Sequence, residues 1–422
     1  MNLCRVRSAE SGILPFIPLA FIPVHNRQPI SGTPKWHFHN SGKDFGILSW
    51  PAKLDPATKK YMTNATNSTS DLTLLSTLLL GAAGNDRLER IHLIASNYND
   101  ADLVRLWTLA MSNHVILRGF PDLHRVLAAK GSDHAEWVEN AMATERARIQ
   151  HALNCLVPIC QALEEAGDVI VIKSLDHWPD LGSDLDLYTT AVGPDVVAIM
   201  SQRFQARLAE RSWGDKLAHK WNFVVPGLPE LIEVHVGRLG QTGEQVAITN
   251  SLASRARPVQ FGKHTFRVPR PEDRIIISTL QRMYRHFYLR LCDVVQIARL
   301  VDSDSLDYDY LRSLARSAGL WEGLATYLAI VGDYVEKFRG ENLALPYSVT
   351  NAAKFGGDNI RFKQQFLRIP IFPQAAGLYA KEWMKLLSNG ELQNTLRLSL
   401  LPGLAVAAAV AFKMTGNDKG IW

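Results

Sequence analysis

Cysteine is scarce in this sequence. Its 422 residues include four cysteines, with no CxxC pair and no histidine spacing that suits a zinc site. The pattern therefore indicates neither a zinc finger nor a disulfide scaffold, and a reducing cytoplasm is the simplest location. Three of the four lie in helical patterns where a buried thiol is expected, namely Cys155, Cys160 and Cys292.

The sequence also lacks an apolar run long enough to cross a bilayer. Residues 398–412 are apolar apart from Ser399, and they contain Pro402 and Gly403. The run has about fifteen residues, whereas a membrane span takes roughly twenty. We therefore expect no stable span, but a buried helix or one that contacts a membrane surface. A second run, 12–24, carries three prolines that disfavour the helix of a signal peptide.

Neither sign of charge dominates the composition. Lysine and arginine total 46 against 41 acidic residues, which gives a net charge of +5, and 47% of the residues are hydrophobic. These values are ordinary for a globular protein and exclude a wholly disordered chain. The mild basic excess would suit a polyanionic substrate such as an NTP or RNA, but ordinary surface charge is the simpler explanation.

Composition and periodicity divide the chain into five regions and predict an α+β fold. Residues just after Met62 form a polar linker, NATNSTSD, and we hypothesise that the natural start is Met62. The five regions are an irregular N-terminal leader (1–70), a helical lead-in (71–166), an α/β core with a small mixed sheet (167–270), a helical bundle (271–332) and a C-terminal helical extension (333–422).

Short β-branched runs and turns define the predicted core. The run DVIVIK and the run DLDLYTT predict two strands, and a helix follows behind Pro194. Two more extended stretches are KWNFVVPG and ELIEVHVG, and RPVQFGKHTFRV predicts a hairpin that turns at Gly262. A long helix is then predicted from Pro271, with an apolar face that continues through Phe287 to Ala298.

Asp184 and Asp186 are the first candidates for chemistry. They lie one residue apart on a predicted strand, so both side chains project from one face while Leu185 and Leu187 point into the core. Two carboxylates in this arrangement can share a divalent cation, and Mg²⁺ prefers carboxylate oxygens and substrate phosphates. Acidic residues also alternate on the exposed face of many edge strands, so the motif alone is weak.

A third carboxylate is expected on a neighbouring strand. Glu233 lies in the apolar stretch LIEVHVG, which predicts a strand, and His235 is the next residue on the same face. The order of these segments resembles the polymerase β superfamily of nucleotidyltransferases, most closely a bacterial branch of it. The resemblance rests on IVIKS, SDLDLYT, IEVHVG and the stretch from PVQFGKHTFRV to QIARLV, and covers roughly residues 70–330.

The resemblance implies a polymerase β-like core and a set of site residues. Asp184, Asp186 and Glu233 would be catalytic and bind Mg²⁺, with Mn²⁺ as the alternative, and His235 would orient a substrate or a carboxylate. The residues implied to bind the nucleotide are Lys173, Ser174, Gly182 and Ser183. The family normally has glycine where this chain has Ser174, although the serine N–H and hydroxyl can still donate to a phosphate.

Several basic residues are secondary candidates for substrate binding. His219 and Lys220 would either contact an acceptor phosphate or form a solvated strand end. Four residues of the long predicted helix would either line a polyanion groove or form a solvated face: Arg282, Arg285, His286 and Arg290. Asp293 is expected to pair with one of these arginines.

The resulting hypothesis is an Mg²⁺-dependent nucleotidyltransferase of the cytoplasm. It would transfer a nucleotidyl group from an NTP such as ATP to an acceptor in RNA, in a protein or in a small molecule. The alternative is a catalytically silent relative that binds a nucleotide or a partner and acts as a regulator. A third hypothesis is peripheral membrane contact through residues 398–412.

Overall fold

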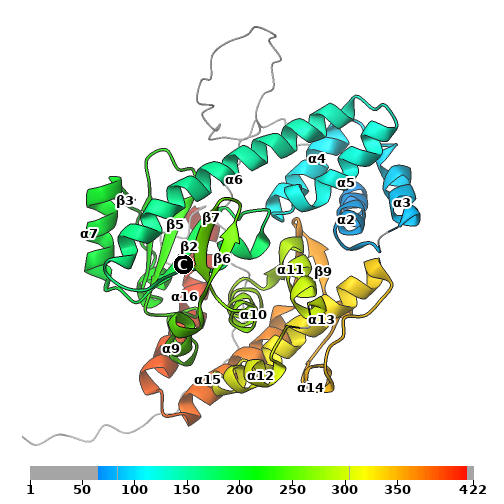
Figure 1. Ribbon diagram of the computed structural model, residues 1–422. Helices are drawn as coiled ribbons and strands as arrows, with labels where there is room; N and C mark the ends of the chain where they lie inside the picture. The colour runs from blue at the N-terminus through cyan, green and yellow to red at the C-terminus, as the bar shows by residue number, and fades with distance from the viewer. Residues whose placement is uncertain (1–64, 83, 304, 416–422) are drawn as a thin grey trace, which may run out of the picture.

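The computed structural model describes residues 65–82, 84–303 and 305–415 (Figure 1). The predicted leader up to residue 64, including the run 12–24 and the proposed start at Met62, lies outside this part of the chain. The NATNSTSD segment was predicted as a linker, but helix α2 begins at Ala65 and includes most of this segment. The predicted end of the irregular leader at residue 70 therefore falls inside helix α2.

In the described part of the chain, five helices precede the sheet, and the last of them is the longest. They are α2 (Ala65–Leu80), α3 (Asn85–Ala95), α4 (Asp100–Ser112), α5 (Ile116–Ala129) and α6 (His134–Glu164). Helix α4 begins with a capping box, because the Asn99 side chain accepts from the N–H of Asp102 and the Asp102 carboxylate accepts from the N–H of Asn99. Helix α6 runs through Pro158 without ending there.

A five-stranded mixed sheet forms the centre of the α/β region. Its strands in spatial order are β1 (Val169–Val171), β2 (Asp184–Thr189), β5 (Leu231–Val236), β4 (Lys220–Val224) and β3 (Arg207–Leu208). Strands β2 and β5 are parallel, and the other neighbours are antiparallel. The predicted small mixed sheet is confirmed.

The two faces of this sheet differ in chemistry. Residues such as Leu185, Leu187, Ile232 and Val234 are fully buried and pack with α6 in one apolar cluster. Alternation places the acidic side chains on the other face. On that face, Ile170 and Tyr188 join a second apolar cluster that is built mainly from helices. The site therefore lies between the sheet and these helices.

The elements that connect and follow the strands are α7 (Gly193–Phe204), α8 (Trp213–Leu217), α9 (Val246–Arg255), β6 (Arg257–Phe261) and β7 (His264–Val268). Of these elements, helix α7 and the hairpin were expected, whereas helices α8 and α9 were not. Strands β6 and β7 form the predicted hairpin, and Gly262 at its turn has a φ of 58° that glycine adopts without strain. Between β1 and β2 lies a short 3₁₀ turn, η1 (Ser174–His177).

The predicted long helix from Pro271 was wrong. The chain instead forms α10 (Pro271–Thr279), a π-helical segment η2 (Leu280–His286), the short strand β8 (Tyr288–Leu289) and then α11 (Leu291–Asp302). The break falls at Phe287, which has a φ of 54°. Strand β8 pairs with β10 (Phe366–Arg368), about 80 residues further along, so a distant segment overrides the local apolar period.

Five more α-helices follow α11 in the described part of the chain. They are α12 (Tyr308–Ser317), α13 (Trp321–Arg339), α14 (Tyr347–Thr350), α15 (Ala376–Ser388) and α16 (Leu392–Thr415). The predicted boundary at residues 332 and 333 falls inside α13. The predicted extension also contains a strand pair that sequence reasoning missed, β9 (Arg361–Lys363) with β10.

Helix α16 contains the apolar run 398–412. Leu398 and Leu401 are buried against Leu386 of α15, which matches the expected buried helix on that side. Leu396 and Leu400 are exposed on the same helix. Among the described helices, none has the length and apolar character needed to cross a membrane.

The architecture confirms the predicted α+β class. A small mixed sheet lies among flanking helices, with further helices before and after it in the chain (Figure 1).

Candidate functional site

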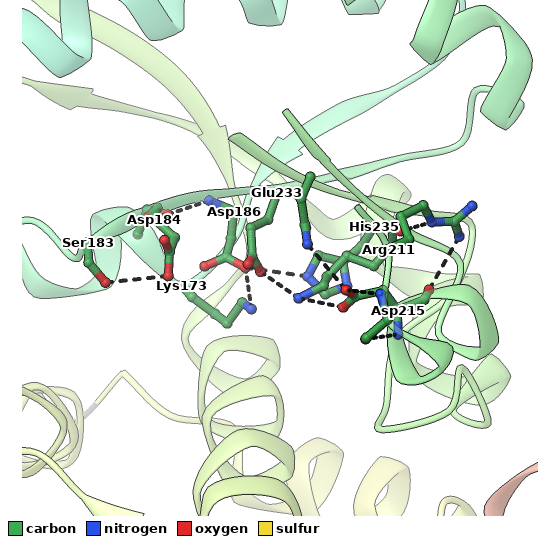
Figure 2. Close-up of polar contacts among 12 residues, drawn as sticks. Lys173, Ser183, Asp184, Asp186, Arg211, Asp215, Glu233 and His235 are labelled. Atoms are coloured by element: carbon green, nitrogen blue, oxygen red, sulfur yellow. Dashed lines mark hydrogen bonds and ion pairs between the residues drawn. The ribbon is translucent and has the colours of Figure 1, made fainter. Parts of the chain in front are cut away.

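Two parallel strands bring three of the predicted residues together. In the pairing of β2 with β5, Asp186 lies opposite Glu233, and Asp184 lies opposite Leu231. Because side chains alternate along a strand, Asp184, Asp186, Glu233 and His235 share one face of the sheet (Figure 2). The expectation of a third carboxylate beside the aspartates is confirmed as geometry, while its catalytic role stays a prediction.

His235 contacts the central aspartate directly. Its Nε2 donates to Asp186 Oδ1 at 3.3 Å, and both side chains are buried. Burial and the nearby Lys173 charge lower the pKa of His235 to about 4, so the imidazole is neutral at pH 7. The Nδ1 atom has no hydrogen-bond partner within the described chain. A neutral imidazole with an unused nitrogen is a capable metal ligand as well as an orienting group.

The next strand, β4, adds residues that sequence reasoning did not assign to the site. Lys220 lies opposite His235 and is buried. Its ammonium lies 3.0 Å from Glu233 Oε2 and 3.1 Å from Asp215 Oδ1. Lys220 is therefore not a solvated strand end but a buried cation between two carboxylates, and its contact with an acceptor phosphate stays a prediction.

Asp215 and Arg211 support that lysine from α8 and the segment before it. Asp215 is buried, and the charges of Lys220 and Arg285 outweigh the effect of its burial and lower its pKa to about 2. Arg211 donates from Nε to the main-chain oxygen of Lys220 at 2.7 Å (Figure 2). The alternation of Lys220 and Asn222 with apolar residues was the available signal, since it places both on the face that carries Glu233.

Lys173 lies in a strained turn at the end of β1. Its φ of 59° and ψ of −54°, together with a 2.6 Å bond from the N–H of Ser174 to the oxygen of Ile172, define a γ-turn. The Lys173 ammonium forms an ion pair with Asp186 (Figure 2). A non-glycine residue in this conformation is unusual, and such strain is concentrated at functional sites.

Ser174 uses both of its polar groups within the protein. Its hydroxyl accepts from the N–H of Asp186 at 2.7 Å and donates to the oxygen of Asp184 at 3.1 Å. The hydroxyl therefore links the turn to β2 by two hydrogen bonds. To bind a phosphate, this side chain would have to give up its hydrogen bond to the oxygen of Asp184. Nucleotide binding by Ser174 stays a prediction.

Gly182 and Ser183 lead directly into Asp184. Ser183 is exposed, and its hydroxyl donates to Asp184 Oδ2 at 3.4 Å. A side chain at Gly182 would meet only main-chain atoms of Asp184, at 3.7 Å or more, so the space beside this glycine is open. Both residues lie where a substrate could reach them, and their predicted nucleotide contacts stay predictions.

The two aspartates differ in their proton affinity. Burial raises the pKa of Asp184 to about 7, and the charges of Glu233 and Asp186 add to this effect. Burial alone would raise the pKa of Asp186 too, but the Lys173 charge and the His235 hydrogen bond hold it below its ordinary value. Asp186 is therefore ionised at pH 7, whereas Asp184 exchanges a proton near neutrality.

The donor atoms that best suit a metal ion come from three residues. One donor atom each of Asp186, Glu233 and His235 lies within 4.8 Å of the other two. Two carboxylates and an imidazole suit Mg²⁺ in part and Mn²⁺ better, because Mn²⁺ accepts nitrogen ligands more readily. These residues fit a divalent cation, and Asp184 lies beside them on the same strand.

Asp293, which was expected to pair with an arginine of the predicted long helix, pairs with Arg282. Arg282 Nε lies 2.7 Å from Asp293 Oδ2, and each side chain is 2% exposed. This confirms the predicted partner of Asp293. It also shows that Arg282 does not lie on a solvated face.

The comparison with protein families adds an independent observation. Residues 183–335, less than half of the chain, match the model of a family described as "Uncharacterised nucleotidyltransferase". This segment belongs to a nucleotidyltransferase family. The nucleotidyltransferase segment begins at Ser183 and contains Asp184, Asp186, Glu233 and His235, so the predicted resemblance is confirmed for these strands. Among curated proteins and among solved structures, no match to the chain was found.

The turn that carries Lys173 and Ser174 precedes the matched nucleotidyltransferase segment. It reaches the carboxylates because β1 pairs with β2, which brings the end of β1 beside Asp186. The site is therefore assembled from the matched segment and from a strand that comes before it.

Proposed function

We propose that this protein is a divalent-metal-dependent nucleotidyltransferase that acts on an NTP and an acceptor hydroxyl. The observation that carries the proposal is the pairing of Asp186 with Glu233 on parallel strands of a nucleotidyltransferase segment, with His235 beside them. Asp184, Asp186 and Glu233 would hold Mg²⁺ or Mn²⁺, with His235 as a further ligand. When bound, such a cation neutralises the phosphates of the NTP and orients them.

The transfer forms one bond and breaks another at the α-phosphorus. The acceptor oxygen would bond to that phosphorus as the bond to the pyrophosphate oxygen breaks, and the hydroxyl proton would pass to a carboxylate. Of the two aspartates, Asp184 is the candidate acceptor, because Asp186 already pairs with Lys173 and His235. Lys173, a flexible point charge, would leave Asp186 and hold the departing pyrophosphate.

Labelling of an acceptor tests this proposal. Purified protein, Mg²⁺ or Mn²⁺ and each α-labelled NTP would be incubated with a cell extract that contains RNA, proteins and small molecules. We expect one component to be labelled, and we expect Asp186→Asn and Glu233→Gln to abolish labelling while circular dichroism stays unchanged. Asp168→Asn is the matched control, because Asp168 is an exposed acid at the start of β1 that pairs with Arg267. Labelling that persists in a folded Asp186→Asn variant contradicts the assignment.

A second candidate is a catalytically silent protein that binds a nucleotide or a partner. Two ammonium groups favour it, because Lys173 pairs with Asp186 and Lys220 pairs with Glu233. The internal bonds of Ser174 favour it too. Calorimetry separates the candidates: NTP binding without pyrophosphate release over a broad set of acceptors supports the silent protein, and pyrophosphate release supports the transferase.

For location, we propose the cytoplasm with transient contact at a membrane surface. The described cysteines Cys155, Cys160 and Cys292 are all free thiols, which suits a reducing compartment. Exposed Leu396 and Leu400 of α16 provide an apolar surface for lipid. Sedimentation with anionic vesicles should fall for Leu396→Gln combined with Leu400→Gln, and unchanged sedimentation would contradict the membrane contact.

A further inference from the structure

Buried side-chain nitrogens without hydrogen-bond partners gather in a second region of the protein, next to the site of the carboxylates. The side chains of Arg118, His177 and Arg282 are 7%, 11% and 2% exposed. Within the described ranges, no hydrogen-bond partner is found for Nε and Nη1 of Arg118, Nδ1 of His177 or Nη1 of Arg282. A buried polar group without a partner costs about 1–3 kcal/mol, so several together indicate a site for an acceptor group.

These side chains lie in one region: Arg118 Nη2 donates to the main-chain oxygen of Trp178, directly after His177, at 2.8 Å, and the N–H of Arg290 donates to Asp293. The rings of His114 and His177 stack with centroids 6.5 Å apart. His177 Nε2 lies 3.8 Å from Asp293 Oδ1, and the same carboxylate pairs with Arg282. We call this group the arginine–histidine cluster; it consists of His114, Arg118, His177, Arg282 and Arg290.

Helix α11 fixes the cluster from one side. The N–H of Leu291 donates to the Asn113 side chain at 2.9 Å, which brings the start of α11 against His114. Arg290 precedes the helix, and its main-chain N–H donates to Asp293 at 2.8 Å. The Nε of Arg290 and the Nε2 of His114 also have no hydrogen-bond partner in the described part of the chain. The start of a twelve-residue helix contributes further positive potential at this point.

The charge balance of the cluster favours an anion. Arg118 pairs with Asp180 and Arg282 pairs with Asp293, while Arg290 adds a third guanidinium group, and burial raises the pKa of Asp180 to about 7. Burial lowers the pKa of His114 and of His177 well below the ordinary value, and the arginine charges add to this effect, so both imidazoles are neutral.

A cation is the alternative occupant. His177, Cys292 and Asp293 place donor atoms within 4.8 Å of one another. However, the Asp293 carboxylate already forms an ion pair with Arg282. Burial also raises the pKa of the Cys292 thiol, so the thiol stays protonated, whereas a metal ion binds the thiolate. The nearby guanidinium groups would also repel a metal ion, so an anion is the better match.

Strained backbone surrounds the same region. His114 has a φ of 52° and Phe287 has a φ of 54°, and both lie in the left-handed region. Arg282 lies on the π-helical segment η2, a conformation that is rare and is often found at functional sites. Strain in segments that meet at one cluster indicates that their positions serve binding in addition to packing.

One short turn connects this cluster with the carboxylates. Lys173, just before η1, pairs with Asp186, and His177 is the last residue of η1. The charge of Arg290 also acts on Asp184, lowering its pKa against the larger effect of burial. The cluster is therefore a neighbour of the proposed active site.

We propose that the arginine–histidine cluster binds a phosphate group of a substrate of this enzyme. Guanidinium forks match the oxygens of phosphate, and the one N–H group of the neutral His114 imidazole can add a donor. The phosphate would belong either to the NTP or to the acceptor. This assignment to a substrate rests on the proposed function, whereas anion binding itself does not.

Inorganic anions test the site without any turnover. We expect phosphate and tripolyphosphate, in metal-free buffer, to raise the melting temperature of the full chain and to bind measurably by calorimetry. Arg290→Gln should weaken this binding at least about tenfold, which corresponds to 1.4 kcal/mol. Arg203→Gln is the matched control, because Arg203 pairs with Glu165 on the surface, where both side chains are about half exposed.

Arg118→Gln provides a second variant in case Arg290→Gln does not fold. If neither anion binds the folded wild-type chain, or if binding is unchanged in a folded Arg290→Gln or Arg118→Gln variant, the proposal is overturned. Asp186→Asn should keep anion binding even though it abolishes labelling. Failure of the labelling experiment alone would therefore contradict the proposed function and leave the anion site standing.

Competition identifies the source of the phosphate. If a non-hydrolysable NTP with Mg²⁺ displaces tripolyphosphate, the cluster binds phosphates of the NTP. If inorganic phosphate still binds when that NTP is saturating, and Arg290→Gln still weakens it, the cluster binds a phosphate of the acceptor. Either result supports a substrate phosphate site.

Discussion

The Ser174 hydroxyl accepts a hydrogen bond from the main-chain N–H of Asp186 at 2.7 Å, and it returns one to the oxygen of Asp184. One side chain thus holds the γ-turn at Lys173 against the strand that carries both aspartates. The serine that departs from the family pattern has a definite structural task here.

Ser174→Ala should destabilise the protein by about 1–3 kcal/mol, because the buried N–H of Asp186 would lose its acceptor. Urea unfolding measures the change. Ser183→Ala is the control, since Ser183 is exposed and makes only a 3.4 Å contact, and it should stay within about 0.5 kcal/mol of the wild type. Equal effects of the two substitutions would show that the Ser174 bonds contribute little.

Lys220→Met should be one of the most destabilising substitutions in the sheet. It leaves Glu233 and Asp215 without their shared cation, and breaking a buried ion pair costs about 3–5 kcal/mol. Chemical unfolding at pH 7 gives the value. Lys216→Met is the matched control because Lys216 is exposed on α8, and a loss below about 1 kcal/mol for Lys220→Met would disprove its role as a buried cation.

Lys173→Gln should strengthen Mn²⁺ binding and weaken NTP binding. The ammonium competes with a metal ion for Asp186, so its removal should raise metal affinity by roughly tenfold, or about 1.4 kcal/mol, while the triphosphate loses a cationic partner. Calorimetric titrations with Mn²⁺ alone and with an NTP measure both effects. A parallel loss of both affinities would indicate that Lys173 serves only to shape the site.

Glu382→Gln should remove a pH dependence of stability. Glu382 of α15 is fully buried and accepts from Gln245; burial and the charge of Glu244 raise its pKa well above the ordinary value. Its carboxyl is therefore protonated when folded, and the wild type should lose stability as the pH rises above the unfolded value of 4.5.

At pH 8 the Glu382→Gln variant should exceed the wild type by at least about 1 kcal/mol, because one pKa unit corresponds to 1.36 kcal/mol. At pH 4 the two should be equal, since the glutamine amide can form the same hydrogen bonds as the neutral acid. Melting temperatures across this range test the prediction, with exposed Glu341→Gln as the control. The same pH slope in both chains would contradict a buried neutral carboxyl.

Local alternation carried much of the information about the carboxylates. DLDLYT and LIEVHV each place acidic or imidazole groups on one face of the strand and apolar groups on the other. Because both apolar faces must be buried in the same core, the polar side chains of the two strands point to the same side of the sheet. Asp186 and Glu233 could therefore be expected on one surface from the sequence, and the pairing of β2 with β5 places them opposite each other.

The partners of charged residues could not be read in the same way. Lys220 looked like a solvated strand end because both of its carboxylates come from other elements, Asp215 on α8 and Glu233 on β5. The helix predicted through Phe287 failed for a similar reason, since its break depends on pairing of β8 with β10. In each case the deciding interaction joins residues whose proximity only the fold creates.

Helix α6, at 1.5 Å per residue about 46 Å long, runs from the N-terminal helices to the sheet. Its C-terminal half packs on the apolar side of β2 and β5. A fragment limited to residues 183–335 would lack this helix and strand β1, and would present that side of the sheet to water. Such a fragment should aggregate when expressed alone, so dissection of this protein into smaller working pieces has to keep α6 attached to the nucleotidyltransferase segment.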